Sequence, residues 1–217
     1  MVVGSGIMAE RLAGGNEAIA LMANALATGA GLAALMLAFG PVSGAHFNPA
    51  VTLADASQGG LPWKHVVPYV SAQVAGACCG VVAAHVMFGE RVLMLSSHAR
   101  AGGAQMFSEF VATFGLLSVI WSVSRRRASM TAIAVPAYIV AAYWFTASTS
   151  FANPAVTIAR SLTDTFSGIR PLDVPGFLLA QVAGAFAATS LFRWLVPSRA
   201  GVGKDVTPLA EDSSRDT

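Results

Sequence analysis

The chain has 217 residues, of which 55% are hydrophobic and 11% are charged, and its mean hydropathy is +0.63. A soluble domain carries about a quarter charged residues, so this composition excludes an ordinary soluble protein and indicates an integral membrane protein. The net charge of +2 gives no indication of a nucleic acid partner.

The chain opens with a short apolar stretch, residues 1–8, which ends before Glu10 and is too short to cross a bilayer. Five longer apolar runs follow, each close to the roughly 20 residues that span a membrane core. They are residues 17–40, 66–89, 105–124, 130–148 and 174–196. We therefore expect an all-α, multi-pass membrane protein.

Basic residues indicate the orientation of these runs. They are Arg125, Arg126 and Arg127 after the 105–124 run, and Arg193, Arg199 and Lys204 around the end of the last run. Because cytoplasmic loops carry an excess of Lys and Arg, both places, and with them the C-terminus, are expected on the cytoplasmic side. Residues 197–217 are polar and are predicted to form a disordered cytoplasmic tail.

Two segments between the runs are neither polar loops nor long enough to cross the membrane. They are "GPVSGAHFNPAVTLADASQGG", residues 40–60, and "STSFANPAVTIARSLTDTFSG", residues 148–168. Irregular backbone at membrane depth is tolerated only where it is buried in protein or lines a wet cavity. Both segments are therefore predicted to be re-entrant.

The two segments belong to an internal repeat. Asn48 and Asn153 stand 153 − 48 = 105 residues apart, and the phrase AQVAGA recurs at Ala72 and Ala180, a separation of 180 − 72 = 108. Three runs separate the two segments, which is an odd number, so the repeats are inverted and the segments enter from opposite faces. We expect a single domain over residues 1–196, with repeats of about 1–104 and 105–196.

Each segment contains the triplet Asn-Pro-Ala. The two copies are Asn48, Pro49 and Ala50, and Asn153, Pro154 and Ala155. Asn is a preferred N-cap and proline suits the first helical position, so each triplet predicts the start of a short helix. The two starts would face each other mid-membrane, where their partial positive charges repel cations and protons. Both asparagine amides would donate hydrogen bonds to a passing neutral molecule.

With its paired triplets and duplicated AQVAGA, the chain resembles the aquaporin and aquaglyceroporin family, the major intrinsic proteins, over nearly its whole length. The resemblance implies six tilted helices plus two half-helices that meet at the centre of a pore. It also implies a channel domain that assembles as a homotetramer in membrane lipid. No catalytic constellation, metal cluster or phosphate loop is visible in the sequence, so we expect neither an enzyme nor a cofactor.

By the same duplication, the first helix is expected to be truncated. Nothing before residue 17 corresponds to the 105–124 run, which contains Glu109. Either the true start lies upstream of Met1 or this is a damaged form. In the family Glu109 would hold the backbone N–H groups of a re-entrant loop and so support the pore.

In the family a selectivity filter lies nearer the outside. Counted by offset from the two asparagines, its four positions fall on Thr28, Ala141, Ser150 and Val156. Val156 stands where the family has an arginine. Its presence there removes five hydrogen-bond donors and a fixed charge, and predicts a wide, apolar filter.

Two further residues have alternative interpretations. Arg160 lies one helical turn beyond Val156; it would either point into the outer vestibule and restore part of the charge, or pair with the loop near Asp164. His46 is expected to line the inner mouth, with a role in gating as the second interpretation.

Within the family, the runs "VSGAHFNPAVTL" and "AAYWFTASTSFANPAVTIARSLTDTFSGIRPLDVPGF" look most like a bacterial branch associated with arsenic resistance. This likeness implies passage of glycerol-like polyols, neutral metalloid acids such as arsenous acid, and some water across a bacterial inner (plasma) membrane. A water-selective aquaporin, a non-conducting truncated homologue and an inverted-repeat secondary transporter are the alternatives.

Overall fold

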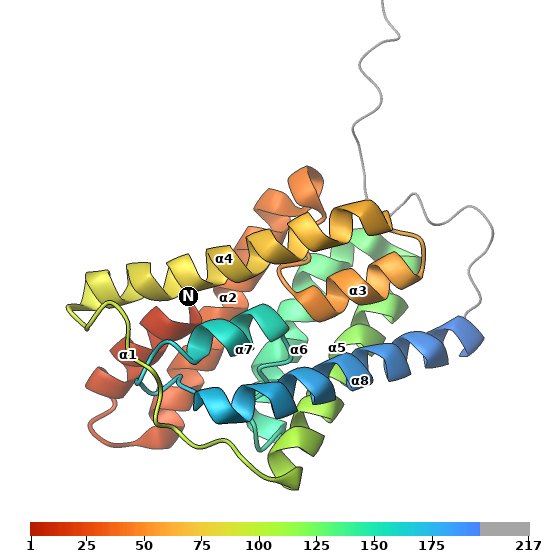
Figure 1. Ribbon diagram of the computed structural model, residues 1–217. Coiled ribbons are helices and arrows are strands. Elements are labelled where there is room, and N and C mark those ends of the chain that lie inside the picture. The colour runs from red at the N-terminus through yellow and green to blue at the C-terminus, as the bar shows by residue number, and fades with distance from the viewer. Residues whose placement is uncertain (196–217) are drawn as a thin grey trace, which may run out of the picture.

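The computed structural model describes residues 1–195, and within this range every regular element is a helix (Figure 1). In chain order the α-helices are α1 (Val2–Leu12), α2 (Glu17–Ser43), α3 (Pro49–Ser57), α4 (Trp63–Phe88), α5 (Gly103–Arg127), α6 (Thr131–Phe145), α7 (Pro154–Arg160) and α8 (Val174–Leu195). Two short 3-10 turns, η1 (Ala128–Met130) and η2 (Pro171–Asp173), precede α6 and α8. The tail predicted to be disordered, residues 197–217, lies outside the described residues.

Long apolar helices make this an integral membrane protein. Four stretches within residues 1–195 are long and apolar enough to cross a bilayer: Glu17–Ser43, Trp63–Phe88, Gly103–Phe145 and Pro171–Leu195. The third stretch holds α5 and α6, which pack on each other, so the five predicted runs correspond to α2, α4, α5, α6 and α8. Helix α1, with 11 residues, is shorter than all five.

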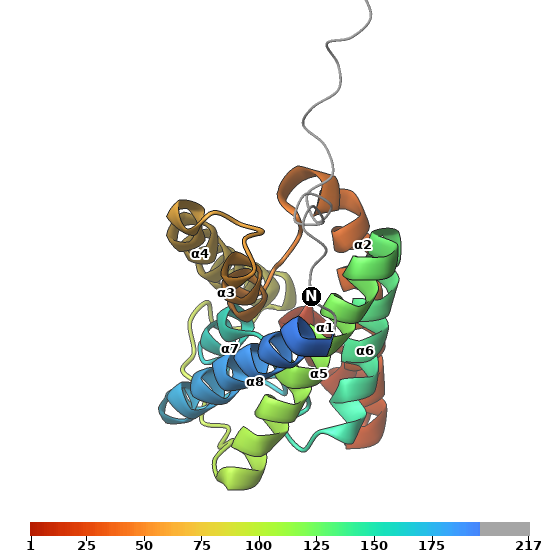
Figure 2. The same cartoon turned by 90° about the vertical axis from the view of Figure 1, so that its right-hand side faces the viewer.

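The helices pair as two copies of one arrangement. Helix α1 packs against α2 and α4, and α5 packs in the same way against α6 and α8. Helices α3 and α7 each contact both α4 and α8, while contacts between α2 and α6 and between α3 and α7 join the two halves (Figure 2). The fold is thus an all-α inverted repeat, in which α3 and α7 point away from each other from the middle of the molecule (Figure 1).

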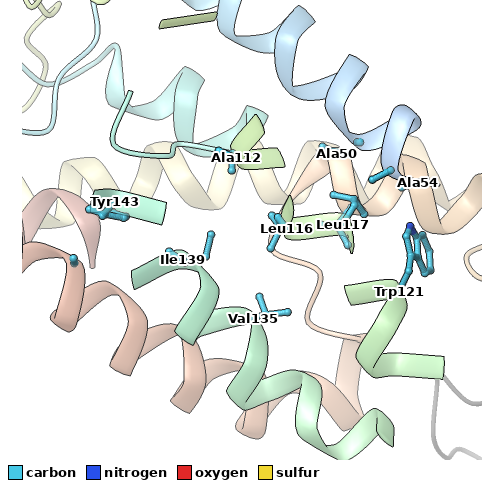
Figure 3. Packing of buried hydrophobic residues seen from close by; sticks show 14 residues of the cluster. Ala50, Ala54, Ala112, Leu116, Leu117, Trp121, Val135, Ile139 and Tyr143 are labelled. Atoms are coloured by element: carbon cyan, nitrogen blue, oxygen red, sulfur yellow. The ribbon is translucent and has the colours of Figure 1, made fainter. Parts of the chain in front are cut away.

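Small residues let the helices approach closely around this middle. A Cβ atom at Gly184 of α8 would lie 2.5 Å from the carbonyl oxygen of Phe110 on α5, so only glycine permits this crossing. Ala50 and Ala54 of α3 belong to the same buried cluster as Leu117 of α5 (Figure 3). Glycine thus permits the crossing of α5 and α8, and small alanines on α3 pack against larger side chains of α5.

Candidate functional site

The two short helices meet at their N-termini through a reciprocal pair of hydrogen bonds. The Asn48 Nδ2 atom donates to the carbonyl oxygen of Ala152 at 2.7 Å, and the Asn153 Nδ2 atom donates to the carbonyl oxygen of Phe47 at 2.7 Å. Each asparagine thus bonds the residue that precedes the other. The two Asn-Pro-Ala triplets predicted to face each other are brought together.

The same two side chains cap the helices they begin. Asn48 Oδ1 accepts from the backbone N–H of Ala50 at 2.9 Å, and Asn153 Oδ1 accepts from that of Ala155 at 3.0 Å. Pro49 and Pro154 occupy the first helical position, where a missing N–H removes no bond. An amide supplies both an acceptor for the cap and a donor for the opposite loop, which explains asparagine rather than aspartate or serine.

The loops that lead into the triplets have an unusual backbone that recurs in both halves. Ala45 and Phe47 have φ angles of 47° and 49°, and Ser150 and Ala152, each 105 residues further on, have φ angles of 51° and 46°. Each non-glycine residue in this left-handed region costs on the order of 1 kcal/mol. Other parts of the fold must therefore hold the loops in place.

In the second half the holding group is Glu109 of α5, which is fully buried. Its Oε1 atom accepts from the backbone N–H of Phe151 at 2.8 Å, and its Oε2 atom accepts from that of Ala152 at 2.8 Å. The Ser148 hydroxyl also donates to Oε1, and the Gln181 amide donates to Oε2, at 2.6 Å each. This is the loop contact that the family resemblance implied for Glu109.

In the first half the corresponding group is Tyr69 of α4. Its hydroxyl donates to the carbonyl oxygen of Ser43 at 2.8 Å and accepts from the backbone N–H of His46 at 3.4 Å. This role was not predicted from the sequence, because the residue at the same place before the second AQVAGA is Phe177, which has no hydroxyl. The two loops thus share a backbone conformation but differ in what holds them.

Two glutamines whose role was not predicted from the sequence hold the short helices. Gln73 Nε2 donates to the Thr52 hydroxyl at 3.0 Å, and Gln181 Nε2 donates to the Thr157 hydroxyl at 2.8 Å. Both come from the AQVAGA phrase, so each half fixes its short helix to the following long helix by the same bond. In the sequence, each glutamine is a polar residue at the same position of an otherwise apolar phrase, and this could have indicated a shared role.

A cavity of about 1030 Å³ runs past the meeting point, and its wall includes Asn48, Asn153 and residues of both loops. Asp55 and Arg160 also line it, each near the far end of its short helix. Helices α3 and α7 point in opposite directions (Figure 1). Asp55 lies in the second half of α3 and Arg160 at the end of α7, so the two residues lie on opposite sides of the meeting point. One end is therefore acidic and the other basic.

Three of the four predicted filter residues line this cavity: Thr28, Ser150 and Val156. The assignment of Ala141 is wrong, because that side chain is exposed and is absent from the cavity wall. Tyr143, two residues on, is buried and lines the cavity, with its hydroxyl 3.5 Å from the Thr28 hydroxyl. Counting back from Asn153 crosses the irregular stretch 146–152, where residue spacing does not follow a helix, and so the offset fails there.

Arg160 is buried at the end of α7 and belongs to the cavity wall. Its Nε atom donates to the carbonyl oxygen of Ser167, and its guanidinium carbon lies 3.4 Å from the centre of the Phe151 ring. It does not pair with Asp164, which instead accepts from the backbone N–H and the hydroxyl of Ser97 at 2.8 and 2.9 Å. These bonds hold the pKa of Asp164 below its ordinary value.

His46 lies in the cavity wall near the acidic end. Its Nδ1 atom is 3.2 Å from the Thr52 hydroxyl, and its Nε2 atom is 3.8 Å from Oδ2 of Asp55. The Tyr69 ring meets it edge-on at 5.4 Å between centroids. In residues 1–195 no three His, Cys, Asp or Glu side chains come together as metal ligands would.

Comparison with known proteins supports the same picture. The sequence matches the family model described as major intrinsic protein over residues 1–147 and again over residues 126–215. It is 51% identical over 207 residues to the aquaglyceroporin AqpS of Rhizobium meliloti (strain 1021), an alignment that covers 95% of this chain and 88% of that protein.

Plant proteins are more distant relatives. The aquaporins NIP1-3 and NIP1-4 of Oryza sativa subsp. japonica are 35% and 36% identical, over 72% and 78% of this chain. The aligned regions cover 58% and 64% of those proteins, so the chain spans less than two thirds of their length.

Proposed function

The chain belongs to the major intrinsic protein family, and we propose that it forms a passive channel for small neutral solutes, in the inner membrane of a bacterium. The solutes we propose are glycerol-like polyols and neutral metalloid acids such as arsenous acid, with modest passage of water. The similarity to a protein named as an aquaglyceroporin supports the polyols. The metalloid acids rest on their likeness to polyols in size and hydroxyl groups.

The observation that carries this proposal is the meeting of the two short helices in the cavity wall. Asn48 and Asn153 each use one amide N–H on the opposite loop. Among the described residues the second N–H of each amide has no protein acceptor, and both residues line the cavity. A neutral solute with oxygen acceptors is stabilised there, whereas a cation meets the positive ends of two helices.

The side chain at position 156 favours solutes larger than water. Val156 lines the cavity with a short apolar side chain at the position where the family resemblance places arginine. We propose Thr28, Tyr143, Ser150 and Val156 as the filter. His46 lines the opposite part of the cavity, where we propose that it shapes the inner mouth.

Further aspects of the proposal concern assembly and orientation. We propose a homotetramer with one pore in each subunit and a cytoplasmic C-terminus. Large apolar side chains such as Leu37, Val67 and Met87 are exposed on α2 and α4, as lipid or neighbouring subunits require. The arginines Arg125 to Arg127 at the end of α5 support a cytoplasmic position for that end.

Three permeabilities measured in proteoliposomes test the proposal: those for water, glycerol and arsenous acid. We expect glycerol and arsenous acid to enter well above the rate in protein-free liposomes, without saturation at low concentration. Fast water flux with both solutes excluded would instead identify a water-selective aquaporin. Flux no higher than in protein-free liposomes would identify a non-conducting homologue, and flux that follows an imposed ion gradient would identify a transporter.

A further inference from the structure

Arg160 places a buried positive charge in the wall of the cavity. It is 3% exposed, ends α7 and follows Val156 by one helical turn, so that both side chains face the same cavity. The Nε atom is bound to the carbonyl oxygen of Ser167. Among residues 1–195 the two terminal nitrogens of its guanidinium group have no protein acceptor, and so they are free to bond a molecule in the cavity.

A second arginine increases the positive charge here. Arg100, from the loop before α5, donates from Nε to the carbonyl oxygen of Gly168 at 2.8 Å, and its guanidinium carbon lies 5.0 Å from the centre of the Phe151 ring. The Phe151 ring is therefore in contact with both cations. Glu109 accepts from the backbone N–H of Phe151, and three further donors occupy its oxygens. Arg160 is buried and Arg100 is half-buried, so two cations lie at this one ring.

An independent observation points to a ligand at the same place. The Ser150 hydroxyl is buried, has no hydrogen-bond partner among the described residues, and belongs to the cavity wall. Its residue is held in the left-handed region at φ 51° by the loop contacts of Glu109. A buried hydroxyl without a partner costs free energy unless a solute or water bonds it.

We propose that Arg160 and Ser150 form a binding site for solute oxygens at the basic end of the cavity, and that Arg160 is the specificity-determining cation of this pore. The charge enters the wall one helical turn beyond Val156, which leaves the cavity wider at Val156 itself. The solutes that fit are oxygen-rich and uncharged, because their oxygens accept from Arg160 while Ser150 donates or accepts. Cations are repelled at the same point. This inference rests on the proposed function, since a filter acts only in a conducting pore.

Cysteine modification tests the charge without any measurement of flux. In a protein with Cys78→Ala and Cys79→Ala, the single cysteine of Val156→Cys is reacted with two methanethiosulfonates. One carries a sulfonate and the other a trimethylammonium group. The rate of each reagent is divided by its rate on a free thiol. On this scale we expect the anionic reagent to react about tenfold faster than the cationic one, because a nearby cation attracts it. Arg160→Met should abolish this preference, while Arg160→Lys should keep it.

Arg11→Met is the matched control, because Arg11 is an exposed cation that does not line the cavity. Its Nη2 atom pairs with Oε1 of Glu90 at 2.8 Å. This variant should leave the preference unchanged. The proposal is overturned if the cationic reagent reacts as fast as the anionic one while Arg160 is intact, a comparison that needs no Arg160 variant to fold. It is also overturned if neither reagent reacts, because the side chain at position 156 would then not face water.

Flux supplies the second half of the test. Ser150→Ala and Arg160→Lys should each lower glycerol permeability several-fold relative to water, because each removes a donor matched to the solute. Unchanged ratios in both variants would refute the binding site. If the unmodified protein passes no solute, the proposed function fails, but the thiol reactivities still decide whether Arg160 sets the charge of the cavity.

Discussion

Gln181 of α8 donates a hydrogen bond of 2.6 Å to the Oε2 atom of Glu109 on α5. The same glutamine amide bonds the hydroxyl of Thr157 on α7 at 2.8 Å. Helices α5, α7 and α8 and the second loop are therefore joined through one carboxylate and one amide. In the first half Gln73 bonds Thr52 in the same way, but no carboxylate joins them within the described residues.

Glu109→Gln should destabilise the protein strongly despite its near-identical shape. A carboxamide has one oxygen, whereas two backbone N–H groups, a hydroxyl and an amide now converge on two. Each donor left facing the new NH₂ group costs about 1–3 kcal/mol. We expect a lower melting temperature in detergent and reduced glycerol flux. Glu17→Gln is the control, since Glu17 is exposed in the first turn of α2, and an equal loss there would contradict the argument.

Asn48→Asp and Asn153→Asp should each reduce glycerol flux about tenfold and admit a cation leak. Aspartate keeps the oxygen that caps the helix but loses the N–H that bonds the opposite loop, and it adds a negative charge at the meeting point. Proteoliposome flux and a membrane-potential dye measure the two effects. Asn16→Asp changes an exposed cap at the start of α2 in the same manner and should conduct normally. Tight cation exclusion in both pore variants would contradict the prediction.

Val156→Arg should slow glycerol more than water, because a long side chain fills volume that only the larger solute needs. We expect the ratio of glycerol to water permeability to fall at least fivefold. Val156→Met adds bulk without charge or donors, and so a comparison of the two variants separates size from hydrogen bonding. If neither variant changes the ratio, Val156 does not border the narrow part of the pore.

Tyr143→Phe should alter solute selection, because it removes a hydroxyl that lines the cavity beside Thr28. We expect glycerol permeability to fall about twofold to fivefold, while water permeability changes less. Ala141→Leu, on the exposed face of the same helix, is the matched control and should have no effect. If Ala141→Leu lowered glycerol permeability while Tyr143→Phe did not, Ala141 rather than Tyr143 would belong to the filter.

The sequence predicted the fold well, because its strongest signals were long apolar runs and a repeated phrase. It also predicted the helix starts at Asn48 and Asn153, since a cap and a proline specify a helix start locally. The bonds of these amides to the opposite loops were not predicted, because they depend on how the two loops pack. It failed at Ala141, where residue counting crossed an irregular stretch. It left Arg160 open, because the acceptor on Ser167 comes from a loop whose path only the packed structure defines.

The unequal support of the two loops has a consequence for local opening. The second loop is fixed by a buried carboxylate, whereas the first is fixed by the half-buried Tyr69 through a 3.4 Å bond to His46. Backbone amides exchange with solvent hydrogen at rates set by the free energy of local opening. The amide of His46 should therefore exchange well before those of Phe151 and Ala152, so that the first loop opens more readily than the second although the two share one backbone conformation.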